Sequence, residues 1–158
     1  MKTVKVPMES LIQVILLQLE TAKKANLTVT GFSMRPMLRQ YRDSVVLAPI
    51  NGGLQTGDIA LYLRDNGSYV LHRVIRLTAE GYLFCGDNQA ELESVRQDQL
   101  IAVVTGYTKN GQYRQLVGIG YGLYRFIMVR LFFMRKYYIW VRRGVGRLCS
   151  RIKRRYEK

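Results

Sequence analysis

A serine in a tight turn is the first sign of chemistry in this chain of 158 residues. The segment 31–38 reads Gly-Phe-Ser-Met-Arg-Pro-Met-Leu, with Ser33 near its centre. Gly31 permits backbone angles that other residues rarely adopt, and Pro36 pushes Arg35 toward an extended conformation. A serine held this rigidly could act as a nucleophile, and its own backbone amide could act as an oxyanion donor. In isolation such a turn is more often an ordinary solvated loop, so the residues that follow decide the interpretation.

The second candidate is the only histidine of the chain, His72. It lies in the run 70–75, Val-Leu-His-Arg-Val-Ile, whose alternation places Val70, His72 and Val74 on one face of a strand. A lone histidine on an apolar face is usually a core residue whose ring bonds a backbone carbonyl. As a general base, an imidazole with a pKa of ~6.5 would take the proton of Ser33 near neutral pH, and activity would rise between about pH 6 and 7.

Other chemistries find little support in the residue types. The chain has two cysteines, Cys85 and Cys149, which lie far apart in the sequence, and neither belongs to a CxxC pair. With a single histidine as well, we expect no metal site, no disulfide framework and no cofactor.

The elements that must position Ser33 and His72 are mostly short strands. Apolar residues at helical spacing first predict an amphipathic helix over 8–25 that packs on the body. Closely spaced apolar runs with turn residues between them, such as Asp-Asn-Gly at 65–67, then indicate a mostly β body with flanking helices, an α+β class. The expected strands are 27–30, 45–47, 59–63, 69–77, 82–85, 100–107 and 113–117.

Four motifs occur in a distinctive order: Ser33-Met34-Arg35-Pro36, Gly57-Asp58-Ile59, His72-Arg73-Val74-Ile75 and Gly86-Asp87-Asn88. In this order and spacing the chain resembles the signal peptidase I clan, which includes the LexA-type self-cleaving repressors, over about residues 30–107. Bacterial signal peptidases and LexA have a lysine base before the arginine of the third motif, whereas the endoplasmic-reticulum type has histidine, as here. The resemblance implies a β-ribbon catalytic body over 27–117, with Ser33 as nucleophile and His72 as general base.

The third member of the site has several candidates. In the histidine-type enzymes a carboxylate a few residues beyond Gly-Asp-Asn orients the imidazole, and without a gap this position falls on Glu93. Asp87, inside the Gly-Asp-Asn turn, is slightly favoured because a tight turn would hold it firmly, although turn aspartates often only bond nearby amides. Either carboxylate would fix the tautomer of His72 and stabilise its imidazolium form. The remaining alternative is a dyad of Ser33 and His72 alone.

The resemblance also bears on the oxyanion hole and the substrate cleft. Many signal peptidases have a hydroxyl residue two positions before the nucleophile, where this chain has Gly31. The oxyanion hole would then rest on backbone amides, that of Ser33 first. Met34, Pro36 and Met37 match residues that border a shallow apolar cleft for small side chains, while simple packing beside the turn is the alternative for the methionines.

These residues lead to three functional hypotheses. The first is a serine endopeptidase that cuts a leader or signal segment from a peptide or protein precursor. The second, self-cleavage of the repressor type, ranks low because only 32 residues precede Ser33 and the chain contains no Ala-Gly sequence. The third is a non-catalytic protein on the same fold that binds a membrane or nucleic acid.

The charge of the chain is concentrated at its C-terminal end. The region 113–158 has 13 of the 25 Lys and Arg residues but one of the 11 acidic residues. We therefore expect three parts: a helix over 1–26, the body over 27–117, and a basic, aromatic helical tail over 118–158. Within this tail, 116–134 fits an interfacial segment better than a membrane span, with integral association through this segment as the alternative. Residues 141–158 predict a basic amphipathic helix drawn to anionic lipid, and the alternative is a solvated charged helix that packs its apolar stripe on the body. The sequence thus predicts a cytoplasmic protein peripheral to the membrane, without an N-terminal anchor, with nucleic acid as a less favoured partner.

Overall fold

The computed structural model describes residues 8–132, 134 and 137. Two α-helices flank a set of strands, which confirms the predicted α+β class and each of the predicted strands within a few residues. The predicted first helix ends earlier than expected, at Thr21. A short strand and a 3-10 turn after the Gly-Asp-Asn motif were not predicted. The elements are α1 (Met8–Thr21), β1 (Ala25–Thr28), β2 (Ser44–Ala48), β3 (Ile59–Leu63), β4 (Tyr69–Thr78), β5 (Gly81–Cys85), β6 (Glu93–Val95), η1 (Gln97–Gln99), β7 (Leu100–Lys109), β8 (Gln112–Gln115) and α2 (Ile119–Arg130).

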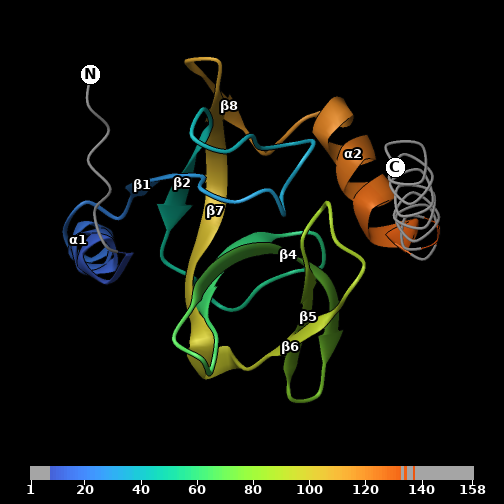
Figure 1. Cartoon of the computed structure of the whole chain (residues 1–158), viewed down its shortest axis with the longest axis horizontal. Coiled ribbons are helices and arrows are strands. Elements are labelled where there is room, and N and C mark those ends of the chain that lie inside the picture. Colours follow the sequence, from blue (N-terminus) through green and yellow to red (C-terminus); the bar gives the residue numbers. More distant parts are fainter. Residues whose placement is uncertain (1–7, 133, 135–136, 138–158) are drawn as a thin grey trace, which may run out of the picture.

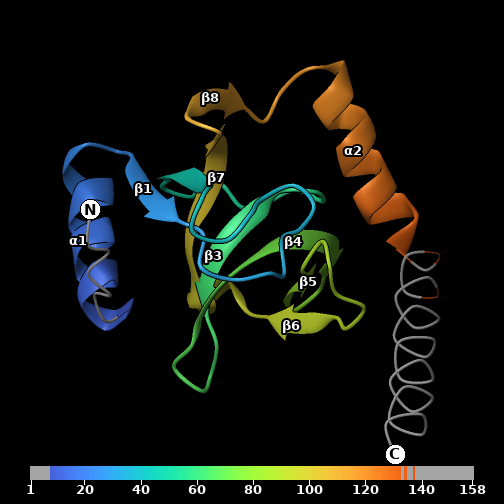
Figure 2. The ribbon, with the colours of Figure 1, turned by 45° about the horizontal axis from the view of Figure 1, so that its top comes forward.

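The strands form one sheet in which every pairing is antiparallel. Their order is β1-β2-β7-β3-β4-β5-β6, and β8 pairs with β7. The long strand β7 joins two halves of the sheet, β1–β2 and β3–β6, because it pairs with both β2 and β3 (Figure 1). Helix α1 lies beside β1 at one end of the molecule, and α2 lies at the opposite end (Figure 2). The segment that holds the serine turn lies between β1 and β2.

The β3–β4 hairpin determines which side chains accompany the histidine. Its register pairs Ala60 with His72 and Tyr62 with Val70. Side chains two residues apart on a strand share a face, so Tyr62 lies diagonally across from His72 on the same face of the hairpin. Arg73, the next residue of β4, points to the opposite face.

Two apolar clusters stabilise the two halves. In the first, Ile12, Ile15 and Leu19 on the inner face of α1 pack with buried side chains of β1, β2 and β7. In the second, the curled strands β3–β6 enclose Tyr62 and Phe84, whose ring centroids lie 4.8 Å apart. Burying a large apolar side chain contributes about 1.5–3 kcal/mol, so each cluster fixes the position of the strands around it.

In the C-terminal region the structure describes α2 and, after it, residues 131, 132, 134 and 137. The part of the chain that the structure describes contains no helix long and apolar enough to cross a membrane. The expected interfacial segment at 116–134 includes α2, whereas the basic amphipathic helix expected at 141–158 lies outside the described residues.

Candidate active site

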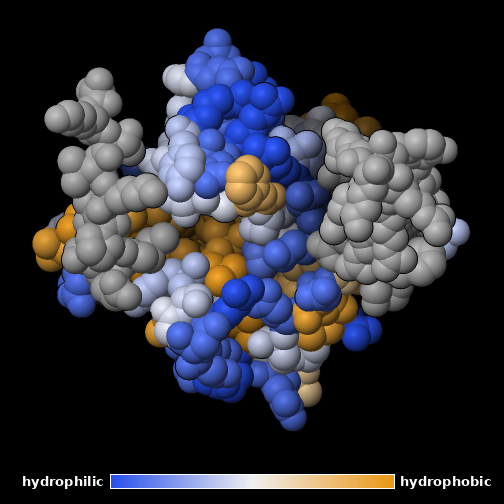
Figure 3. Space-filling model, in the orientation of Figure 1, coloured by the Kyte–Doolittle hydropathy of each residue, from blue (hydrophilic) through white to orange (hydrophobic). Residues whose placement is uncertain are grey.

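Ser33 and His72 line the same cleft, which has a volume of about 380 Å³. One wall of the cleft is formed by β1 and the serine turn, residues 27–34, and the other by the start of β4, residues 69–72. Arg64, at the end of β3, also faces the cleft. On the face drawn in Figure 3, apolar surface gathers near the middle, between hydrophilic areas above and below it. The two residues that the sequence singled out therefore share one concave site, although 39 positions separate them in the chain.

The Gly-Asp-Asn turn holds the serine turn in place. The backbone N–H of Asn88 donates a 2.7 Å hydrogen bond to the carbonyl oxygen of Ser33. The side-chain amide of Asn88 donates to the carbonyl oxygen of Phe32 at 3.4 Å. A Cβ atom on Gly86 would lie only 2.8 Å from the carbonyl oxygen of Ser33 and 2.9 Å from its Cβ. Glycine is therefore needed at this position because the backbone of the serine turn approaches so closely.

The serine turn differs in some details from the sequence-based expectation. Gly31 does not adopt the positive φ that glycine permits. Met34 lies against the cleft, whereas Pro36 and Met37 are not among the residues that line it. Met34 and Met37 are both buried in the first apolar cluster, so packing is their evident role. The Arg35–Pro36 peptide bond is cis.

The imidazole of His72 is buried, and its Nδ1 atom lies near two side chains. The hydroxyl oxygen of Tyr62 lies 3.1 Å from Nδ1, and a carboxylate oxygen of Glu93 lies 3.6 Å from it. The hydroxyl of Tyr62 in turn donates a 2.8 Å hydrogen bond to the other carboxylate oxygen of Glu93. The structure thus brings Glu93, and not the favoured Asp87, to the ring of His72.

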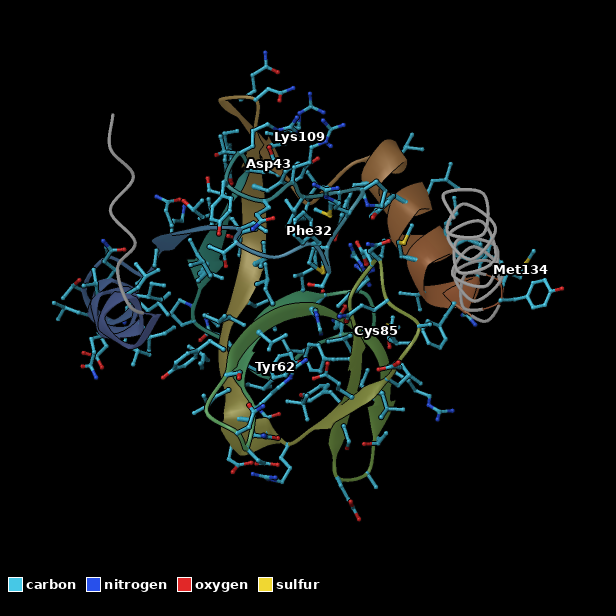
Figure 4. The ribbon with its side chains drawn as sticks, viewed as in Figure 1. Phe32, Asp43, Tyr62, Cys85, Lys109 and Met134 are labelled. Atoms are coloured by element: carbon cyan, nitrogen blue, oxygen red, sulfur yellow. The ribbon has the colours of Figure 1, made fainter. Side chains whose placement is uncertain are left out.

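An arginine fixes the carboxylate of Glu93. Arg64 donates from Nε to one oxygen of Glu93 at 2.7 Å and from Nη2 to the other oxygen. This bidentate, charge-assisted pair restrains the carboxylate in one orientation. Figure 4 shows Tyr62 among the strands of the lower half and Phe32, next to the nucleophile candidate, on the loop above them.

The environment shifts the pKa values of these groups in different directions. Burial lowers the pKa of His72 to about 4, although the negative charge of Glu93 opposes the shift. Burial tends to raise the pKa of the Glu93 carboxyl, but hydrogen bonds from Arg64 and Tyr62 outweigh it and lower that pKa. Burial and the bond to Glu93 raise the pKa of the Tyr62 hydroxyl. At neutral pH the site therefore contains a neutral imidazole, a neutral phenol and an ionised carboxylate.

Asp87 has a different partner from the one expected. Its two carboxylate oxygens accept hydrogen bonds from Nε and Nη2 of Arg73, each at 2.8 Å, and both side chains are fully buried. Tyr124 of α2 donates to the same carboxylate at 2.8 Å, and the hydroxyl of Tyr121 accepts a bond from Arg73 at 3.1 Å. Asp87 thus joins α2 to the strand that carries His72. Asp87 lies in the expected turn, but this turn directs its carboxylate to Arg73 and not to His72.

The sequence analysis did not single out Tyr62 or Arg64. The signal for Tyr62 was present, because the Asp-Asn-Gly turn fixes the hairpin register and the register places Tyr62 on the face of His72. The pairing of Arg64 with Glu93 depends on the unpredicted strand β6, which pairs with β5 and brings Glu93 across.

Comparisons with known proteins add no assignment at this point. No protein-family model, curated protein or solved structure matches the chain. Within the described residues, no group of three or more His, Cys, Asp or Glu side chains is placed to hold a metal ion. The functional argument therefore depends on the geometry of the cleft.

Proposed function

We propose that the protein is a serine endopeptidase with a signal peptidase I-like fold, and that it cuts a leader or signal segment from a peptide or protein precursor. The observation that carries the proposal is the shared cleft, in which Ser33 and His72 face the same space while the far side of the imidazole contacts Tyr62 and Glu93. A nucleophile, a base and a group that orients the base are the components that acyl transfer to a serine requires.

In the proposed reaction, the hydroxyl oxygen of Ser33 attacks the carbonyl carbon of the scissile peptide bond. Its proton passes to Nε2 of His72, the nitrogen that the contacts of Nδ1 leave for this role. When the tetrahedral intermediate collapses, the C–N bond breaks and the imidazolium gives its proton to the leaving amine. In the second half of the reaction, the same nitrogen takes a proton from water, whose oxygen attacks the acyl carbon. The ester C–O bond then breaks, and the imidazolium returns its proton to the oxygen of Ser33. The backbone amide of Ser33 is the proposed first donor to the oxyanion.

A peptide library tests this function without knowledge of the natural precursor. The purified chain is incubated with synthetic extended peptides in which each position is varied, and mass spectrometry identifies the new termini. The expected result is cleavage by the wild type, none by Ser33→Ala, and full cleavage by Ser68→Ala, a control at an exposed serine in the β3–β4 turn. Cleavage that persists in Ser33→Ala would contradict the proposal.

A second proposed property is binding to an anionic membrane surface, which the exposed side of α2 favours. Large apolar side chains project from this helix, and Ile119 is 93% exposed while Leu123 and Phe126 are more than half exposed. The other side of α2 is attached to the body through Tyr121 and Tyr124. The chain that follows α2, residues 131–158, contains ten Lys or Arg and one acidic residue. An apolar helix face followed by a basic segment fits the interface of a membrane that contains anionic lipid.

A further inference from the structure

We propose that Tyr62 is the positioning residue that sets the tautomer of His72, so that the imidazole is connected to the carboxylate of Glu93 through the phenol and not directly. This inference deepens the proposed function and rests on it for the catalytic role of His72. The geometry that supports it involves three described side chains from three strands, β3, β4 and β6.

The first step is the distance between the ring and each of its neighbours. The hydroxyl oxygen of Tyr62 is 3.1 Å from Nδ1 of His72, which is a hydrogen-bonding distance. The carboxylate oxygen of Glu93 that faces Nδ1 lies 3.6 Å from it, which is too long for a hydrogen bond. The direct partner of Nδ1 is therefore the phenol.

The second step is to count the protons. A phenol has a single O–H to donate, and Tyr62 donates it to Glu93 at 2.8 Å. Glu93 is ionised and pairs with Arg64 through both oxygens, so the carboxylate has no proton to give in return. If the phenol donated to Nδ1 instead, two oxygen atoms 2.8 Å apart would face each other with no hydrogen between them.

The third step follows for the imidazole. Since the phenol proton is engaged with Glu93, the bond between Tyr62 and His72 requires Nδ1–H as donor and the phenol oxygen as acceptor. A neutral imidazole has one N–H, so Nε2 has a free lone pair. This is the tautomer in which His72 could accept the proton of Ser33. Once Nε2 is protonated, the imidazolium keeps its bond to Tyr62, and the negative charge of Glu93 stabilises it.

Burial makes this arrangement effective. Tyr62 is completely buried, and His72 is 2% exposed. The ionised groups around the ring are Glu93 from β6, Arg64 from the end of β3, and Asp87 from the turn after β5. In such a weakly solvated site, a water molecule could replace the phenol as the partner of Nδ1 only at a substantial cost. The loss of the phenol oxygen should therefore change which nitrogen holds the proton.

Nitrogen NMR can test the inference without any substrate, because the chain has one histidine. Protein labelled with ¹⁵N-histidine gives the two imidazole nitrogens of His72 alone, and their shifts distinguish a protonated from an unprotonated nitrogen. At pH 7 we expect a protonated Nδ1 and an unprotonated Nε2 in the wild type. In Tyr62→Phe we expect the population with the proton on Nε2 to rise at least several-fold.

A matched control separates this effect from the loss of any buried hydroxyl. Tyr82→Phe removes a buried phenol oxygen in the same apolar cluster, where it accepts a bond from the Leu54 amide. We expect this variant to leave the tautomer of His72 unchanged, and thermal unfolding shows whether both variants fold. If Tyr62→Phe does not fold, the wild-type spectrum is still decisive. A proton on Nε2 in the wild type, or a Tyr62→Phe spectrum with an unchanged tautomer, would overturn the inference.

Activity provides a second, independent measurement. On a peptide that the wild type cleaves, Tyr62→Phe should lower kcat roughly 10- to 100-fold, by analogy with the loss of the residue that orients a metal-bound histidine, while KM changes little. Tyr82→Phe should retain wild-type kcat. If Ser33→Ala shows that cleavage does not depend on the serine, the proposed function fails while the NMR result still decides the role of Tyr62. If cleavage depends on Ser33 but neither kcat nor the tautomer responds to Tyr62→Phe, this inference alone fails.

Discussion

Asn88 donates its backbone N–H to the carbonyl oxygen of Ser33 across a distance of 2.7 Å, and so connects two segments that are 55 positions apart in the chain. This bond explains why a Gly-Asp-Asn turn accompanies the serine turn. Gly86 allows the close approach, Asp87 anchors the turn to Arg73, and Asn88 holds the serine backbone. A change in this turn should therefore move Ser33, the proposed nucleophile, without a substitution at Ser33 itself.

The first prediction concerns Gly86. In Gly86→Ala the new Cβ would meet backbone and Cβ atoms of Ser33 at 2.8 and 2.9 Å, which must shift apart. We expect a loss of about 1–3 kcal/mol in the free energy of unfolding, as for other overpacked sites, together with a large loss of cleavage. Denaturant unfolding and peptide cleavage measure the two effects. Gly120→Ala is the control, because no atom lies within 4 Å of a Cβ there, and it should retain stability and cleavage.

The second prediction concerns the proposed nucleophile and base. Ser33→Ala and His72→Ala should each abolish cleavage while the fold is retained. Because the two residues would act as one unit, the double variant should cost little more than either single variant. Cleavage rates on one peptide, with circular dichroism as the check on folding, decide the point. Full activity in either single variant would refute the assignment.

The third prediction separates the two carboxylates. Glu93→Gln weakens the pair with Arg64 and the bond from Tyr62, so it should reduce kcat with a modest effect on stability. Asp87→Asn leaves the fully buried Arg73 without its counter-charge, and breaking such a pair costs about 3–5 kcal/mol. We therefore expect the larger stability loss from Asp87→Asn, and the larger fall in kcat per folded molecule from Glu93→Gln. The reverse ranking in kcat would return the orienting role to Asp87.

How far the sequence predicts this site can be seen from these same residues. The strands, the serine turn and the apolar face of His72 could be predicted, because turn residues and alternation act over a few positions. The resemblance offered Glu93 as one candidate beside Asp87, but the residues alone could not decide between them, because Glu93 reaches the ring of His72 only through the pairing of the three-residue strand β6 with β5. Asp87 was favoured because the sequence shows its turn but not its pairing with Arg73, a buried pair that also contacts Tyr121 and Tyr124 of α2. Local signals thus singled out Ser33 and His72, which line one cleft, while long-range packing determines which carboxylate lies beside His72.

The fourth prediction is a pH dependence of stability that comes from His72. Burial lowers its pKa from 6.5 to about 4. Well above pH 6.5 the imidazole is neutral in both the folded and the unfolded chain, so it adds no pH dependence there. As the pH falls from 6.5 toward 4, the unfolded chain binds a proton that the folded chain does not, and the free energy of unfolding decreases, in total by about 3 kcal/mol. Denaturant unfolding of the wild type and His72→Gln between these pH values isolates this contribution as their difference.

The same pKa changes the expected activity profile. An unperturbed imidazole would give a rising limb at about pH 6–7, whereas the buried ring of His72 remains a free base to about pH 4. Cleavage should therefore persist at pH 5 in any protein that remains folded. Two results would show that burial does not lower the pKa of His72. One is an activity profile whose rising limb has its midpoint at the ordinary histidine pKa, and the other is a stability difference between the wild type and His72→Gln that does not vary with pH.

The fifth prediction concerns the exposed side of α2 and the basic residues after it. Full-length protein should sediment at low salt with vesicles of phosphatidylglycerol and phosphatidylcholine, but not with phosphatidylcholine alone. Each Lys or Arg near an anionic surface contributes about 1 kcal/mol, and salt screens this attraction. Removing residues 141–158, which contain eight Lys or Arg, should therefore release most of the protein. The truncated protein should still unfold cooperatively, because the body and α2 are intact.

The apolar part of this interaction needs its own variant. Leu123→Glu with Phe126→Glu places charges on the exposed face of α2, where they would have to enter the interface, so vesicle binding should fall although the basic tail is unchanged. Leu77→Glu is the control, because it adds a charge at an exposed leucine of β4 and leaves α2 unchanged, and binding should be nearly normal. Equal binding by both variants would mean that charge alone attracts the protein. If the full-length chain ignores anionic vesicles but binds duplex DNA with a steep salt dependence, its basic residues serve nucleic acid and the membrane proposal is wrong.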